Sequence, residues 1–279
     1  MKPETGPAPR RLPAGSGFKW LLQGLALLRL QPARLLLIAM FLQLILGLTQ
    51  IPLLGLIVII AVPGFSAGLL EALHLTALGG RPQLKTLFLP LASAGHSGRL
   101  LAMGALVFAV GVLSMSLLLG NSEQLTDQAL LQQIEQGDLD ALGQINQDSL
   151  RQIALAFLLG VGISGTLSYF TIPLIWFGNR KVGDALAVGL KALAINWKPF
   201  AVLGLGLMLL LVPVGLVSGA LFAVGSGGLL TTLAMGLVLI LLLGFQLMIF
   251  STQYTAFRDI FGIPAPDVPA PQDDSQLLA

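Results

Sequence analysis

The sequence predicts an all-α integral membrane protein with six transmembrane helices arranged as hairpins. Three observations lead to this fold class. Hydrophobic residues make up 55% of the chain and charged residues only 10%, four long tracts carry no ionisable group, and basic residues gather on one side of the expected spans. The mean hydropathy of +0.88 disfavours a water-soluble domain.

The four uncharged tracts set the number of spans. As one helix, residues 35–70 would reach roughly 54 Å, whereas a bilayer core is about 30 Å thick. This tract and residues 199–257 are therefore expected to hold two spans each, and residues 100–122 and 152–179 one each. The predicted spans are about 34–49, 52–73, 100–119, 153–177, 199–222 and 229–255.

Each pair of spans is expected to follow a short amphipathic helix at the membrane interface. The first covers Phe18 to Leu30, the second lies within 82–94, and the third leads into Trp197. Residues 24–31 also align loosely with residues 189–196, so the fold is either three repeats of a helix and a hairpin or a chance similarity of Leu-rich segments.

Three segments are expected outside the six-span domain of residues 17–257. Residues 1–16 are proline-rich and predict a disordered tail without a cleaved signal peptide. Residues 121–150 hold six acidic and no basic side chains and predict a periplasmic loop with two short helices. Residues 258–279 form a second tail.

The distribution of basic residues predicts the orientation. With six spans, 14 of the 15 Lys and Arg residues lie on the side of the two tails, and Arg151 alone lies on the other. The positive-inside rule then places both termini in the cytoplasm and the acidic loop 121–150 on the opposite side of the membrane. The same residues are expected to contact anionic lipid headgroups on the cytoplasmic face, and they require no nucleic acid as partner.

The composition disfavours an enzyme. The chain has no cysteine and only two histidines, so disulfides, thiol catalysis and His-rich or sulfur metal sites are excluded. Ser164 lies in a Gly-Ile-Ser-Gly string, but the sixth span offers no histidine as its base. We therefore expect no catalytic residues, metal or cofactor.

Glu71 and His74 are the first candidate binding residues. They are three residues apart and share a helix face near the inner end of the second span. Ionisable residues in spans suggest a proton relay or a substrate contact. The structural alternative, which we favour, is that Glu71 reaches the interface or pairs with Arg81 or Lys85.

Four glutamines are the remaining candidates: Gln43 and Gln50 in the first span, and Gln246 and Gln253 in the sixth. Each pair is seven residues apart and forms a polar stripe on one helix face. The stripes would line a hydrophilic pathway in a transporter. The alternative, which we favour, is that these glutamines form hydrogen bonds between helices.

Small residues four apart predict close helix packing within the spans, because they allow backbones to approach. These pairs are Gly64 and Gly68, Gly160 and Ser164, and Gly215 and Gly219.

Several segments resemble a family of uncharacterised six-span inner-membrane proteins of proteobacteria. These proteins are distantly similar to the membrane domain of some glycerophosphodiester phosphodiesterases. The resemblance rests on Gly17-Phe18-Lys19-Trp20-Leu21-Leu22-Gln23-Gly24, Ile51-Pro52-Leu53-Leu54-Gly55, Pro63-Gly64-Phe65-Ser66-Ala67-Gly68 through Glu71-Ala72, and Asn196-Trp197-Lys198-Pro199-Phe200. It implies an inner-membrane location but no activity and no catalytic residues.

The sequence thus favours a non-catalytic scaffold, anchor or assembly component of the cell envelope, with a protein partner expected at the acidic loop 121–150. The alternative is a transporter or channel for small solutes or lipids, with the four glutamines around a central cavity.

Overall fold

The computed structural model describes residues 8–119, 147–224 and 229–262, and these residues are helical without any strand. The first part of the chain forms α1 (Ser16–Leu30), α2 (Pro32–Gly47), the 3₁₀ helix η1 (Leu48–Gln50), α3 (Pro52–Ala77), η2 (Leu84–Phe88), α4 (Leu89–Ala92) and α5 (Ser97–Leu119). The second part forms α8 (Gln147–Trp176), α9 (Val182–Ile195), α10 (Trp197–Val224) and α11 (Leu229–Phe261).

Six of the described helices are long and apolar enough to span a membrane. They are α2 with η1, α3, α5, α8, α10 and α11, so the predicted number of spans is confirmed at this level. The candidate spans are Pro32–Gln50, Pro52–Ala77, Ser97–Ser114, Ala154–Trp176, Trp197–Leu221 and Thr231–Phe261.

Prolines mark the starts of the first two candidate spans. Pro32 and Pro52 each occupy the first position of a helix, where the missing N–H costs nothing. Ile51, which precedes Pro52, is extended (φ −96°, ψ 114°), as a residue before proline prefers. Pro63 lies inside α3 and does not end it. The first long tract therefore divides into two helices at Ile51.

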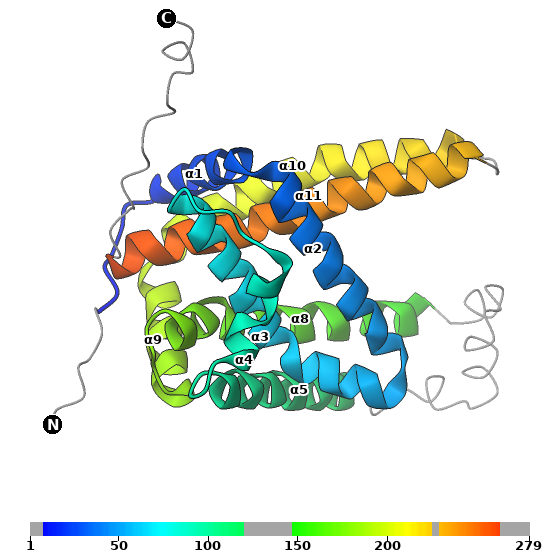
Figure 1. Ribbon diagram of the computed structural model, residues 1–279. Coiled ribbons are helices and arrows are strands. Elements are labelled where there is room, and N and C mark those ends of the chain that lie inside the picture. Colours follow the sequence, from blue (N-terminus) through cyan, green and yellow to red (C-terminus); the bar gives the residue numbers. More distant parts are fainter. Residues whose placement is uncertain (1–7, 120–146, 225–228, 263–279) are drawn as a thin grey trace, which may run out of the picture.

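The helices pack most tightly at one end of the molecule, on the left in Figure 1. There α1 packs against α10 and α11, and α8 packs against α9 and α5. The largest fully buried side chains gather at this end and include Trp20, Phe170, Tyr254, Phe257 and Phe261. Away from it, α10 and α11 run side by side toward the upper right, whereas α5 and α8 stay below, so the two pairs diverge.

The segments that precede the three pairs of spans are part of this packed end. Trp20 on α1 is fully buried, and its ring centroid lies 5.3 Å from that of Phe200 on α10. Leu87 in η2 is also fully buried and lies against Gly68 on α3. These segments therefore contribute to the core as well as offering exposed apolar side chains such as Phe18.

Residues 8–15 differ from the disordered tail predicted over residues 1–16. The backbone N–H of Arg10 donates to the carbonyl of Ile260 at the end of α11 (2.9 Å). The backbone N–H of Leu12 donates to Oδ1 of Asn196 (2.8 Å), and Nδ2 of Asn196 donates to the carbonyl of Arg10 (2.9 Å). We call residues 8–15 the N-terminal strap. The described part of the chain leaves out residues 1–7, nearly all of the predicted loop 121–150, and residues 263–279.

The predicted small-residue pairs differ in what they contact. A side chain at Gly64 would collide with Leu91, and one at Gly68 with the backbone of Leu87, so both glycines permit close packing. A Cβ atom at Gly160, Gly215 or Gly219 would have no neighbour within 4 Å. These three glycines therefore do not serve packing among the described residues.

Candidate functional site

Glu71 and His74 lie on one face of α3 and face α8 and α11 at the packed end. The Glu71 carboxylate accepts a hydrogen bond from the indole Nε1 of Trp176 on α8 (Oε2 to Nε1, 2.9 Å). The His74 imidazole shares a hydrogen bond with the hydroxyl of Tyr254 on α11 (Nδ1 to Oη, 2.8 Å). The two predicted candidates therefore connect α3 to two other spans.

Aromatic rings and a second charge complete the group. The centroid of the His74 ring lies 5.3 Å from that of Phe177, and the His96 ring lies 5.1 Å from that of Trp176. The guanidinium carbon of Arg258 lies 5.5 Å from the centroid of the Tyr254 ring, a cation–π contact. We call the following residues the Glu71 cluster: Glu71, His74, His96, Trp176, Phe177, Tyr254 and Arg258.

The hydrogen-bond partner of Glu71 differs from the expected one. We expected Glu71 to reach the interface or to pair with Arg81 or Lys85, whereas among the described residues its carboxylate accepts a hydrogen bond from Trp176. Little in the sequence pointed to this partner, because Trp176 is only a tryptophan near the end of an uncharged tract. Such positions are usually read as interface anchors, and only the folded chain shows that the indole points into the bundle.

The chemistry of the Glu71 cluster favours a structural role. The described residues contain no group of three His, Cys, Asp or Glu side chains that could hold a metal ion. The cluster itself offers a carboxylate, two imidazoles, a phenol and a guanidinium, all surrounded by aromatic rings. The hydrogen bonds of Glu71 and His74 join α3 to α8 and α3 to α11, which fixes the relative rotation of three spans.

We expect Trp176→Phe to lower the free energy of unfolding by about 1.5 kcal/mol, because a half-buried carboxylate would lose its hydrogen-bond donor. Thermal unfolding in detergent measures this change. The matched control is Trp197→Phe, since Trp197 is 61% exposed, and it should leave stability nearly unchanged. Equal midpoints for the two variants would show that the hydrogen bond to Glu71 contributes nothing measurable.

The four glutamines do not share one environment. Gln43 and Gln50 are exposed on α2 and η1, and Gln246 is half-buried on α11. Gln253 is buried, and its Nε2 donates to the backbone carbonyl of Tyr169 on α8 (2.5 Å). Gln253 thus joins two spans, which is the structural use of such a residue.

Asn196 is a buried polar residue that the sequence did not single out. It is fully buried, and besides its two hydrogen bonds to the N-terminal strap it donates from Nδ2 to the carbonyl of Ala192 (3.0 Å). Nearby, the indole Nε1 of Trp20 donates to Oδ2 of Asp259 (2.9 Å). These contacts join the strap, α1, α9 and α11.

Comparisons of this chain with protein-family models, with curated proteins and with solved structures found no match.

Proposed function

We propose that this protein is a non-catalytic scaffold of the bacterial inner membrane that binds other membrane proteins through the free part of α10. The observation that supports the proposal is the exposure of this helix. Each of the five consecutive residues 208–212 is exposed, and Leu209 reaches 74%. Five consecutive residues of a helix point in all directions around its axis, so this part of α10 is uncovered on every side that α11 leaves open.

The exposed part of α10 has the features of a helix-packing surface. Gly215 and Gly219 are four residues apart, and a Cβ atom at either position would have no neighbour within 4 Å. Lipid tails are as apolar as leucine, so helices in membranes associate through close backbone approach at small residues and not through hydrophobicity alone. A transmembrane helix of another protein could approach α10 closely at these two glycines.

We expect a photo-crosslinking residue at Leu216 to capture a discrete protein in native membranes, because Leu216 is 71% exposed and adjacent to Gly215. The same residue at Leu117 on α5, which is 72% exposed, serves as the matched control. Immunoblotting for a mass-shifted adduct, followed by mass spectrometry of the captured protein, gives the result.

A second set of variants tests whether the glycines form the contact. Gly215→Leu and Gly219→Leu should abolish the adduct, whereas Gly236→Leu on α11, which also has free space around it, should preserve it. Deletion of residues 121–150 tests the acidic segment as a further docking element. Two results would contradict the scaffold proposal. The first is that the residue at Leu216 forms adducts with lipid but with no protein. The second is that the control residue at Leu117 captures the same protein equally well.

The orientation is part of the same proposal, with both termini in the cytoplasm and three hairpins that turn on the periplasmic side. The basic residues support it, since 14 of 15 fall on one side. Because the chain has no cysteine, single cysteines report accessibility without background. We expect Glu135→Cys to react with a membrane-impermeant thiol reagent in spheroplasts, and Lys85→Cys to react only after lysis. If Lys85→Cys reacted in spheroplasts and Glu135→Cys only after lysis, the orientation would be the opposite of the one proposed.

A further inference from the structure

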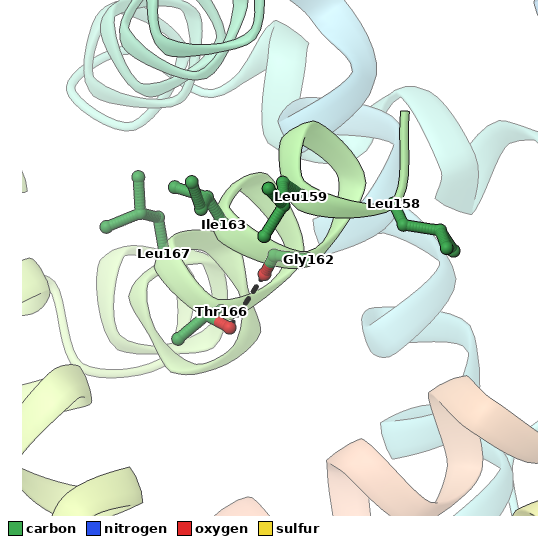
Figure 2. Close-up of a pocket in the computed structure, with 6 residues that line it drawn as sticks. All are labelled: Leu158, Leu159, Gly162, Ile163, Thr166 and Leu167. Atoms are coloured by element: carbon green, nitrogen blue, oxygen red, sulfur yellow. Dashed lines mark hydrogen bonds between the residues drawn. The ribbon is translucent and has the colours of Figure 1, made fainter. Parts of the chain in front are cut away.

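One face of α8 carries an apolar pocket outside the packed end. It is a hollow of about 330 Å³, and its lining residues come from α8 alone (Figure 2): Leu158, Leu159, Gly162, Ile163, Thr166 and Leu167. The Thr166 hydroxyl, the polar side-chain group of this lining, donates to the carbonyl of Gly162 (2.7 Å). With that hydroxyl satisfied inside the helix, the pocket can contact hydrocarbon without leaving a polar group unpaired.

The pocket continues a face that is already an interface between helices. Phe170 follows Thr166 by four residues and Ile163 by seven, so all three share a helix face. The Phe170 ring packs against Phe200 on α10 and against Phe261 on α11, with centroids 5.6 and 5.7 Å apart. The face that is covered at the packed end is therefore uncovered two turns further along α8.

The opposing face of α11 is uncovered as well. Gln253, which donates to α8, is preceded on its own helix face by Leu242 eleven residues earlier and by Leu239 fourteen residues earlier. These two leucines are exposed. Since α8 and α11 diverge from their contact at Tyr169 and Gln253 (Figure 1), the two exposed faces begin at that contact and separate along the helices.

A single basic residue lies on the pocket face near the start of α8, away from the contact with α11. Arg151 is exposed, and it precedes Leu155 by four residues, Leu158 by seven and Gly162 by eleven. These four positions therefore form one stripe along α8, which we call the α8 stripe. The rise from Arg151 to Gly162 is roughly 16 Å. Half the hydrocarbon thickness of a bilayer is about 15 Å, which is the depth that the acyl chain of a phospholipid reaches.

We infer that the α8 stripe is a phospholipid-binding site, with the lipid phosphate at Arg151 and an acyl chain in the pocket around Gly162. The guanidinium group suits phosphate oxygens because it can donate two parallel hydrogen bonds. This site is separate from the α10 surface of the proposed function and does not depend on it.

Native mass spectrometry of the full chain in mild detergent, titrated with phosphatidylglycerol, tests the site. Gly162→Phe should reduce lipid binding about tenfold, because the ring would occupy the space of several methylene groups. A Cβ atom at Gly162 meets nothing within 4 Å, so the fold should tolerate the substitution. Gly160→Phe is the matched control, since Gly160 has the same free space but is not among the residues that line the pocket. It should bind lipid as the parent chain does.

A second pair of ligands tests the role of Arg151. Arg151→Gln should weaken phosphatidylglycerol binding about fivefold, the value of one basic residue at an anionic surface, and should leave binding of a diacylglycerol with the same acyl chains unchanged. If Gly162→Phe fails to accumulate, Leu159→Trp is the alternative filling variant, since Leu159 lines the pocket and is half exposed.

The outcomes separate the proposal from its alternatives. Equal lipid binding by Gly162→Phe and Gly160→Phe would overturn the pocket as an acyl site. An equal effect of Arg151→Gln on both ligands would overturn the phosphate contact. A photo-crosslinking residue at Leu159 that captures a protein and no phospholipid in native membranes would show that a partner helix occupies the pocket face of α8 instead.

Discussion

Replacing Asn196 by alanine is expected to lower the free energy of unfolding by about 2–4 kcal/mol, because the change removes three hydrogen bonds between its buried side chain and backbone groups. Those groups are the N–H of Leu12 and the carbonyls of Arg10 and Ala192. Thermal unfolding in detergent gives the stability. Amide hydrogen exchange gives the local effect, and the Leu12 amide should lose its protection.

The control for this prediction is Lys198→Ala, two residues further along the chain. Lys198 is exposed, and its replacement should change neither the unfolding midpoint nor the exchange of Leu12. An Asn196→Ala protein whose Leu12 amide stays protected would show that the N-terminal strap is fixed by other contacts, such as the hydrogen bond from Arg10 to Ile260.

The second large effect is expected at Gly104, where α5 crosses α3. A Cβ atom at this position would overlap the backbone carbonyl of Ile60. A carbonyl in the middle of a helix cannot rotate away, so Gly104→Ala must push α3 and α5 apart. Overpacking of this kind costs about 1–3 kcal/mol, and thermal unfolding in detergent should show it as a lower midpoint.

Gly111→Ala on the same helix is the matched control. A Cβ atom at Gly111 has no neighbour within 4 Å, and alanine is a better helix former than glycine by up to about 1 kcal/mol. This variant should be neutral or slightly stabilised. If Gly104→Ala unfolds at the same temperature as Gly111→Ala, close contact of the two backbones is not needed for the fold.

The spans were predictable because their signal is local. The predicted second span, 52–73, and the observed α3, Pro52–Ala77, begin at the same proline, whose missing N–H breaks no helical hydrogen bond in the first turn. The ends of spans were less accurate, and α11 continues to Phe261 instead of ending near residue 255. The charges of Arg258 and Asp259 suggested that the span ends at the membrane–water interface. A helix can nevertheless continue beyond the hydrocarbon, and α11 includes both residues.

The hydrogen-bond partners could not be predicted in the same way. Glu71 was recognised as a candidate because a carboxylate inside an apolar tract is unusual, yet its partner Trp176 lies 105 positions away. The strap was misjudged for the same reason. Its prolines argue for disorder, and its order comes from Asn196, which is more than 180 positions away.

The sequence by itself determined that the chain has six helices able to span a membrane, because the absence of charge over bilayer lengths is a property of consecutive residues. The tertiary structure alone decided which polar groups meet, where small residues are packed, and which parts of α8 and α10 stay uncovered. The physical reason is that apolar side chains are nearly interchangeable in lipid, so helix placement depends on shape and on a few hydrogen bonds between distant residues.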